Sequence, residues 1–480
     1  MEICHPKIIC LVVLLIPAFC DGKGLNVTEV KHALDTGKEI VDSIHKVSGF
    51  IYESKDVTDV AHALKTGMKI VDTLDKVTDF ISTLADLADG AGEFLSGVVS
   101  IVELVMDLTG GKEESPELKY LRNLSKTINT RFDEVDAQLS DMKKLVEWSS
   151  VLAPYLAIAL KVRAISSDYN KLFTVPTSVL ETETQYFIKT FESGYQECGT
   201  ELYLGFMEDM GSLGGNLLES AMTFYENDRA KLRSFMKALT KLLFTASQVE
   251  LGYFAAKNSS DTPLDIELHR SQWEDRFKEI VKRMLAVDQE VELKWKDQYK
   301  QDINRFLLDN RNENSSYVSD SLYVQLSTKY FWRDWLVILS DHVDNQYDRN
   351  QFYEGYAHSD YGKDVVVTSL PMANSTVDKH EMGEMAQSLR QTYYDKGTRG
   401  NADLVFSWID PTVRYNYTKH GAIGVIHSNK NTAFNARSYT DAPSHSWDCS
   451  GQHCMSCDLL NCERLDVFTL CSNYYVYFFG

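Results

Sequence analysis

Residues 94–106 read FLSGVVSIVELVM, and they decide how the first half of the chain folds. Apart from Glu103 the segment is apolar on nearly all sides, and a helix that is apolar all round lies buried. A core helix is our main interpretation and a membrane-inserting helix the alternative, because these thirteen residues fall short of the roughly twenty that span a bilayer. The residues of this candidate helix are Phe94, Leu95, Val98, Val99, Ile101, Val102, Leu104, Val105 and Met106.

A repeat lies directly upstream of this segment. Residues 27–51 (VTEVKHALDTGKEIVDSIHKVSGFI) align on residues 57–81 (VTDVAHALKTGMKIVDTLDKVTDFI) with 15 of 25 positions identical. Apolar residues recur three or four apart in each copy, which is typical of one face of an amphipathic helix. Two copies are too few for a solenoid, so the repeat predicts a duplicated helical hairpin over residues 21–85.

A long helix is predicted downstream. Ser115, Pro116 and Glu117 supply an N-cap, a first-turn proline and an acidic residue at the positive helix end. The arm from Tyr120 to Trp148 then carries a heptad stripe, as in a coiled coil. We interpret the stripe as packing within the chain, and homo-oligomerisation through it is the alternative. Its residues are Leu121, Leu124, Ile128, Phe132, Val135, Leu139, Met142 and Val146.

The chain changes character after about residue 310. Two further long helices are predicted before that point, over Asp228–Lys257 and Glu267–Leu307, and the polar stretch Asn310–Ser316 is the best linker. Beyond it, β-branched runs separated by turn residues predict strands. These runs are Val365–Thr368, Gly421–Ile426 and Asp466–Leu470.

The predicted fold class is mainly α. An N-terminal helical bundle with long hairpin helices is followed by a smaller α+β domain with a disulfide-rich C-terminal tail. The predicted segments are a signal peptide (1–20), the duplicated amphipathic hairpin (21–85), a helical bundle with the apolar helix and heptad arm (86–310), an aromatic-rich α+β domain (311–448) and a Cys-rich tail (449–480).

The first twenty residues are typical of a secretory signal peptide. Lys7 precedes an apolar run, and Ala18 and Cys20 place small side chains before a cleavage site. A membrane anchor is the alternative, but the apolar run is shorter than a bilayer span. We therefore expect a secreted, extracellular protein that begins near Asp21.

Cysteines and sequons agree with export. Removal of residues 1–20 leaves six cysteines, an even number that predicts three disulfides in an oxidising compartment. The disulfide candidates are Cys198, Cys449, Cys454, Cys457, Cys462 and Cys471. Six Asn-x-Ser/Thr sequons predict a glycoprotein. They lie at Asn26, Asn123, Asn258, Asn314, Asn374 and Asn416.

Charge and motif content exclude several function classes. The formal charge of −20 repels phosphate backbones, so we expect no nucleic-acid partner. Cys454 and Cys457 have zinc-ligand spacing, but disulfides explain them better in a secreted chain. The stretch His380–Glu384 fails as a zinc-protease helix because Glu384 stands where the second histidine should be. No sequence pattern couples residues to a mechanism, so we expect no catalytic residue, no cofactor, no metal and no enzymatic activity.

An aromatic cluster lies near the start of the C-terminal domain. Aromatic side chains can form either an interface hot spot or a core. We expect core packing between helices and strands, with some residues left for binding. The candidate binding aromatics are Trp332, Trp335, Tyr353 and Tyr356.

The order of parts resembles the rapunzel and cephalotoxin-like family. The apolar helix and heptad arm are followed by a helix that ends in Leu251-Gly252-Tyr253, and then by Lys329 to Leu339 with an aromatic cluster before a short apolar run. The resemblance implies a secreted helical protein of toxin-like type, and it carries over no functional residues. The signal peptide, the duplicated hairpin and the cysteine tail depart from rapunzel, and cephalotoxin has extracellular modules that this chain lacks.

These observations lead to two expectations about function. The first is a secreted, non-enzymatic, cephalotoxin-like protein that acts by binding a cell surface or an extracellular protein, with pore formation through residues 94–106 and membrane contact as a minority mechanism. The alternative is an extracellular structural or matrix interaction protein whose aromatic domain and cysteine tail form the binding end.

Overall fold

The computed structural model describes the chain in two compact units. Unit 1 comprises Met1–Ala221 and Arg233–Ala286, and unit 2 comprises Met222–Leu232 and Val287–Gly480. The described residues are 55–75, 80–110, 113–133, 153–195, 197–207, 216–257, 263–341, 350–352, 355–371, 407, 422–427, 434–438, 465–470 and 474–479. The first repeat copy, the second half of the heptad arm and the cysteine tail up to residue 464 lie outside them.

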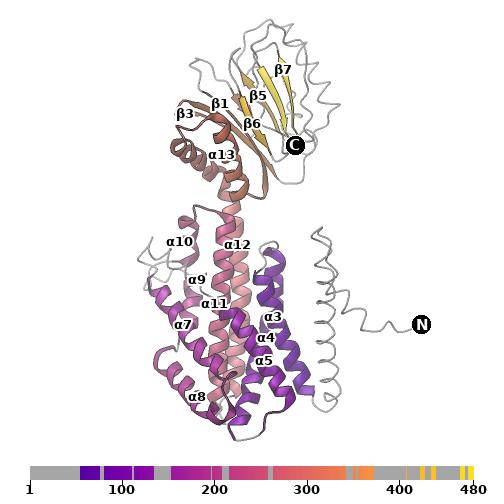
Figure 1. The fold of residues 1–480 in the computed structure, drawn as a ribbon, viewed down its shortest axis with the longest axis vertical. Coiled ribbons are helices and arrows are strands. Elements are labelled where there is room, and N and C mark those ends of the chain that lie inside the picture. The colour runs from indigo at the N-terminus through magenta and orange to yellow at the C-terminus, as the bar shows by residue number, and fades with distance from the viewer. Residues whose placement is uncertain are drawn as a thin grey trace, which may run out of the picture. The chain divides into compact units, whose positions relative to one another are not determined.

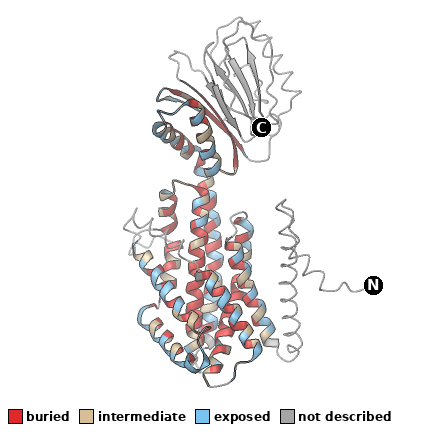
Figure 2. Cartoon of the chain, viewed as in Figure 1, coloured by how far each residue is buried: buried red, intermediate tan, exposed pale blue. Residues whose placement is uncertain are grey.

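Unit 1 is a bundle of helices that lie side by side (Figure 1). Its helices are α3 (Lys55–Asp75), α4 (Phe80–Met106), the 3-10 turn η2 (Asp107–Gly110), α5 (Pro116–Asp133), α7 (Ala153–Lys171), α8 (Thr177–Thr190), the π turn η4 (Phe191–Tyr195) and α9 (Cys198–Met207). Three more helices contribute residues to both units: α10 (Leu217–Phe224), α11 (Arg229–Lys257) and α12 (Pro263–Asp309). Figure 2 shows that the buried residues of unit 1 face its interior. The mainly α fold and the two long helices α11 and α12 are confirmed.

Local sequence signals set the start of α5 as predicted. The Ser115 Oγ accepts a hydrogen bond from Leu118 N at 3.2 Å, and Pro116 is the first helical residue. An N-cap serine accepts a hydrogen bond from one of the free N–H groups at a helix start, and a first-turn proline removes another of these groups because it has no N–H. Within the described half of the arm, Leu121, Ile128 and Phe132 are buried, so this part of the stripe packs inside unit 1.

The apolar segment forms the second half of α4 and lies in the core. Phe94, Leu95, Ile101, Val102 and Val105 are all fully buried. Val98 and Val99 are nearly so, whereas Leu104 and Met106 are half-buried. This burial supports the core interpretation, and no helix among the described residues is long and apolar enough to cross a membrane.

Packed aromatic rings fix α4 to its neighbours. The Phe94 ring lies 5.8 Å from that of Phe132 and 6.0 Å from that of Phe244, and Phe244 stacks on Phe277 at 4.0 Å. These four rings come from α4, α5, α11 and α12. Large rings bury much apolar area and have defined pair geometries, so they hold the four helices in one arrangement.

The structure divides the chain at other points than the sequence predicted. The predicted boundary at residue 85 falls inside α4, because this helix begins at Phe80 and the second repeat copy, α3, packs along it. The predicted boundary at residue 310 is also moved, since α12 residues from Val287 onward group with the strands. Residues Asn310 to Asn314 form only a short turn before α13 (Ser315–Lys329).

Unit 2 contains two antiparallel four-stranded sheets with the orders β3-β4-β1-β6 and β2-β5-β8-β7. The strands are β1 (Arg333–Asp341), β2 (Asn350–Phe352), β3 (Tyr356–Asp360), β4 (Lys363–Pro371), β5 (Ala422–His427), β6 (Phe434–Ser438), β7 (Leu465–Leu470) and β8 (Tyr474–Phe479). In the first sheet Val337 pairs with Val367. The β-branched runs that predicted strands lie in β4, β5 and β7 from residues 365, 422 and 466 onward, so these predictions are confirmed, and Gly421 lies outside the described residues.

A buried polar group anchors the core of unit 2. Asp302 on α12 is 4% exposed, yet it accepts a hydrogen bond from the Tyr330 hydroxyl at 2.6 Å and pairs with Lys329 Nζ at 2.6 Å. A buried carboxylate is tolerated when it is paired and hydrogen-bonded. Tyr330 also packs near Trp335 at 5.5 Å, so polar and aromatic contacts together hold α13 and β1 on α12.

We expect Val99→Asp to destabilise the protein by about 3 kcal/mol or more, because it buries an unpaired carboxylate in the core of unit 1. Urea unfolding followed by circular dichroism measures the loss. Ser96→Asp is the matched control, since Ser96 is exposed on the same helix. Equal stability of the two variants would contradict the placement of Val99 in the core.

Candidate binding groove

A groove in unit 1 lies between α3, α4 and the start of α12, and its volume is about 1020 Å³. Val60, Ala63, Gly97 and Leu104 give it an apolar part. Seven carboxylates line the rest, and they are Asp59, Asp89, Glu93, Glu103, Asp107, Glu267 and Glu274. Only Arg270 and His62 oppose them among the lining residues, so the groove has a strong negative potential.

Part of this charge is neutralised within the groove wall. Glu93 contacts the His62 ring, and Arg270 pairs with Glu267 and Glu274. Within the described part of the chain, Asp59, Asp89, Glu103 and Asp107 form no ion pair. These four carboxylates are therefore the ones that a cationic ligand would meet first.

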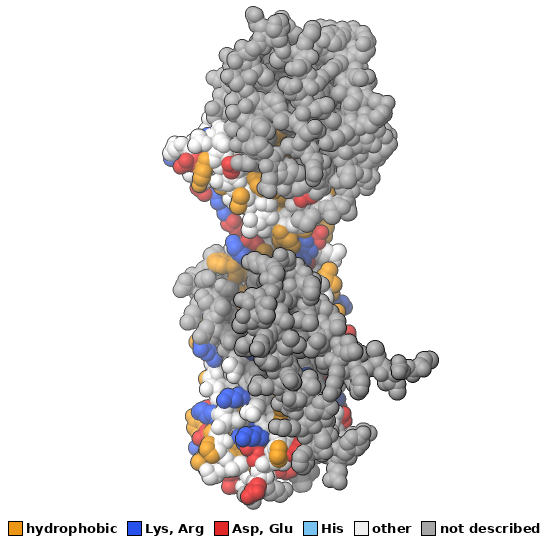
Figure 3. All heavy atoms as spheres, turned by 45° about the vertical axis from the view of Figure 1, so that its right-hand side comes forward, with side chains coloured by type: hydrophobic (Ala, Val, Ile, Leu, Met, Phe, Trp, Pro, Cys, Tyr) orange, Lys and Arg blue, Asp and Glu red, His pale blue; other side chains and the backbone are white. Residues whose placement is uncertain are grey.

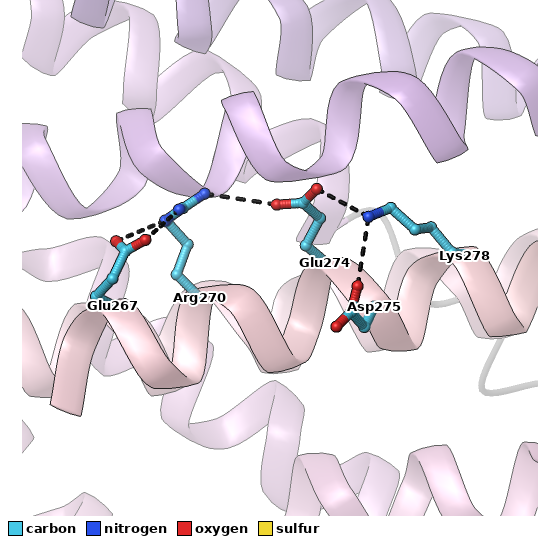
Figure 4. A network of polar contacts seen from close by, with 5 residues as sticks. All are labelled: Glu267, Arg270, Glu274, Asp275 and Lys278. Atoms are coloured by element: carbon cyan, nitrogen blue, oxygen red, sulfur yellow. Dashed lines mark hydrogen bonds and ion pairs between the residues drawn. The ribbon is translucent and has the colours of Figure 1, made fainter. Parts of the chain in front are cut away.

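A chain of ion pairs runs along the α12 side of the groove (Figure 4). Arg270 Nε donates to Glu267 at 3.0 Å, and its Nη1 lies 3.6 Å from Glu274. Lys278 Nζ then donates to Glu274 at 3.0 Å and to Asp275 at 3.3 Å. The hydrogen bond from Arg270 lowers the pKa of Glu267 below its ordinary value.

A glycine brings this network close to α4. A Cβ on Gly92 would lie 2.5 Å from the Glu274 carboxylate oxygen, which is closer than atoms can approach. The missing side chain therefore allows α12 to place Glu274 directly against α4. No local pattern in the sequence reveals that α12 is the helix that meets α4 at this glycine.

The environment of Glu103 raises its pKa. Burial of the carboxylate is the larger cause and repulsion from Asp107 the smaller. Both causes disfavour the charged form of this carboxylate in the folded protein.

The aromatic candidates lie mainly in the core of unit 2. Trp335 is fully buried, and Trp332 and Tyr356 are half-buried against the same cluster. Arg229 lies 4.8 Å from the Trp332 ring, and the Tyr356 hydroxyl donates to Asn304 at 2.8 Å. Tyr353 lies outside the described residues. The structure therefore assigns Trp335 to packing and not to a recognition surface.

Modification candidates are only partly described. Asn123 is exposed on α5, and Asn314 is exposed at the N-cap of α13. Asn26, Asn258, Asn374 and Asn416 lie outside the described residues. Cys198 is buried in α9, where burial raises the pKa of its thiol. The five tail cysteines are not among the described residues, so the disulfides stay a prediction.

The side chains of the groove suit binding by charge and contact. Across the described ranges, no cluster of three or more His, Cys, Asp or Glu side chains could hold a metal ion. Its carboxylates and apolar part can bind a ligand by charge and by contact area. Sequence reasoning missed the groove, because its acidic residues come from helices whose proximity no local pattern reveals.

The fold and groove define a mainly helical protein with a small antiparallel sheet domain and a concave acidic surface. Residues 111–313 match a family model described as the cephalotoxin-like middle helical domain. The chain is thus similar to cephalotoxin-like proteins over this region, as its order of parts suggested. No curated protein and no solved structure matches the chain.

We expect Glu103→Gln to stabilise the protein at pH 7 by less than about 1 kcal/mol, because the carboxylate is only partly buried and solvent still screens its charge. A raised pKa in the folded state means that the charged form opposes folding. The gain should therefore disappear below the ordinary pKa of a glutamate, where the wild-type side chain is protonated in both states. Urea unfolding at pH 7 and pH 3.5 tests this, and a gain that persists in acid would refute it.

Proposed function

We propose that this protein is a secreted, non-enzymatic, cephalotoxin-like protein that acts by binding a partner on a cell surface or in the extracellular space. The match of residues 111–313 to the cephalotoxin-like domain supports the toxin-like class. The signal peptide, the sequons and the cysteine count of the sequence support export.

The acidic groove is the binding surface that we propose, and a basic, partly apolar protein segment is its ligand. Four carboxylates without ion pairs and an apolar part occur together in one concavity. Opposite charge fixes orientation and speeds association, while apolar contact supplies affinity. Elsewhere on the described surface shown in Figure 3, charges of both signs and apolar side chains are interspersed.

Reversing two groove charges tests this proposal. Asp59→Lys with Glu103→Lys should weaken saturable binding of the labelled protein to cultured cells roughly tenfold, because each charge pair lost contributes up to about 1 kcal/mol. Flow cytometry gives the dissociation constant. Glu181→Lys with Glu313→Lys makes the same change in net charge at exposed sites outside the groove.

The outcomes of the charge reversal separate three explanations. Loss in the groove variant alone supports the groove. Equal loss in both variants would assign binding to net charge, and no loss in either would remove the groove from the function.

Two other functions give different results in simple assays. Pore formation would require residues 94–106 to leave the core of unit 1, and dye release from liposomes detects it. A matrix interaction protein would bind through unit 2 and the cysteine tail, so binding would survive the groove variant. Together the two assays distinguish binding through the groove from pore formation and from binding through unit 2.

If the protein is exported, its sequon at Asn314 predicts an N-glycan there, and the orientation of the Asn314 side chain suits this modification. The side-chain oxygen caps α13 by accepting from Tyr317 N at 2.9 Å, while the amide nitrogen that would carry the sugar has no partner among the described residues. Ser316→Ala should abolish the glycan and keep stability. Asn314→Gln should abolish the glycan and cost about 1 kcal/mol through loss of the cap.

Intact mass before and after glycosidase treatment of the secreted protein gives the glycan, and urea unfolding gives the stability. The prediction would be contradicted if wild type and Ser316→Ala carried the same mass of attached sugar, so that no sugar could be assigned to Asn314.

A further inference from the structure

The surface on which α3 packs accepts only small side chains at defined positions. A Cβ on Gly67 would lie 2.1 Å from the Phe94 ring, and a Cβ on Gly97 would lie 2.7 Å from that of Ala63. The Phe94 ring is fully buried and packs on Phe132 and Phe244, so it has no room to move aside. A helix in this position therefore needs glycine and alanine where α3 has them.

The first repeat copy has the same residues at the positions that matter. Seven positions of α3 are buried: Val60, Ala63, Leu64, Gly67, Ile70, Val71 and Leu74. In the first copy the equivalent residues are Val30, Ala33, Leu34, Gly37, Ile40, Val41 and Ile44. Six of the seven are identical, and the last exchanges leucine for isoleucine. The sequence of residues 27–45 therefore repeats the pattern of residues that α3 buries against α4.

The copies differ instead in exposed charge. Lys69 Nζ lies 2.9 Å from Asp86 on α4, and the first copy has Glu39 at the equivalent position. Lys65, also exposed, corresponds to Asp35. Two like charges would thus face each other if residues 27–45 replaced α3. The contacts of His62 with Glu93 and of Asp72 with Arg131 would be kept, because His32 and Asp42 are identical.

We infer that residues 27–45 are a second occupant of the α3 position on α4 in the same chain, and that the two copies compete for it. Charge favours α3, through Lys69 and Asp86, while the apolar contacts are nearly equal for both. An exchange releases α3 as a free amphipathic helix without loss of the core around Phe94. This inference is independent of the groove ligand proposed above.

Competitive cross-linking tests the exchange. In a His32→Cys/His62→Cys/Glu93→Cys variant, a short bis-maleimide joins residue 93 either to residue 62, when α3 is in place, or to residue 32, when the first copy is. Peptide mapping by mass spectrometry gives the ratio of the two products. We expect mostly the 62–93 product and a detectable 32–93 product.

Two further changes should move this ratio. Lys69→Glu with Glu39→Lys leaves every buried residue unchanged. It should raise the share of the 32–93 product about fivefold, because an exposed ion pair of up to about 1 kcal/mol shifts the equilibrium between the two occupants by about this factor. Lys119→Glu with Glu181→Lys is the matched control, since both sites are exposed outside the interface, and it should leave the ratio unchanged. Gly67→Leu blocks α3 by steric overlap and should make the 32–93 product dominant.

Three results would overturn the inference. The first is no 32–93 product in the charge-exchanged variant. The second is a 32–93 product found only between two chains, seen as a doubled mass, which would make a second copy of the protein the occupant. The third is a Gly67→Leu variant as unstable in urea as Gly37→Leu/Gly67→Leu, since competition predicts that only the double variant lacks an occupant.

Discussion

The contact of Gly67 with the ring of Phe94 is the constraint on which unit 1 depends. Because residue 67 has no side chain, α3 approaches α4 closely enough to cover the ring. Phe94 is thereby fully buried and can pack on Phe132 and Phe244, which belong to α5 and α11. One absent side chain thus allows a layer of aromatic rings to join four helices.

The same close packing produces the groove. Gly92 and Gly97 lie on α4 on either side of Phe94 in the chain. The missing side chain of Gly92 leaves room for Glu274, and that of Gly97 leaves room for Ala63. Helices that approach this closely leave their longer polar side chains at the rim, where Asp59, Glu103 and Asp107 collect. The negative charge of the groove comes from acidic residues that α3, α4 and α12 each contribute, and it makes this surface the first place to seek a partner.

The two units hold their cores by different means. Unit 1 relies on stacked rings and small residues around α4. Unit 2 places charges inside, with Asp302 held by Lys329 and Tyr330, and with Arg229 bonded to both oxygens of Asp288 at 2.9 and 2.6 Å. Such pairs lose much solvation when buried, but they are strongly directional and so fix how α12, α13 and the start of α11 meet.

The sequence by itself determined the elements of this protein. The period of apolar residues identified α11 and α12, the Ser115-Pro116 pair marked the start of α5, and β-branched runs marked β4, β5 and β7, because these signals act over neighbouring residues. It also indicated that residues 94–106 are buried, since apolar side chains on every face leave no surface for water.

Only the tertiary structure decided which helices meet. Glu267, Arg270 and Glu274 lie beside α4 although about 170 residues separate them from it in the chain. Trp335 lies in the core although an aromatic side chain of this kind also suits an interface. Contacts between distant residues depend on how whole helices fill space together, and no local pattern in a single sequence encodes that packing.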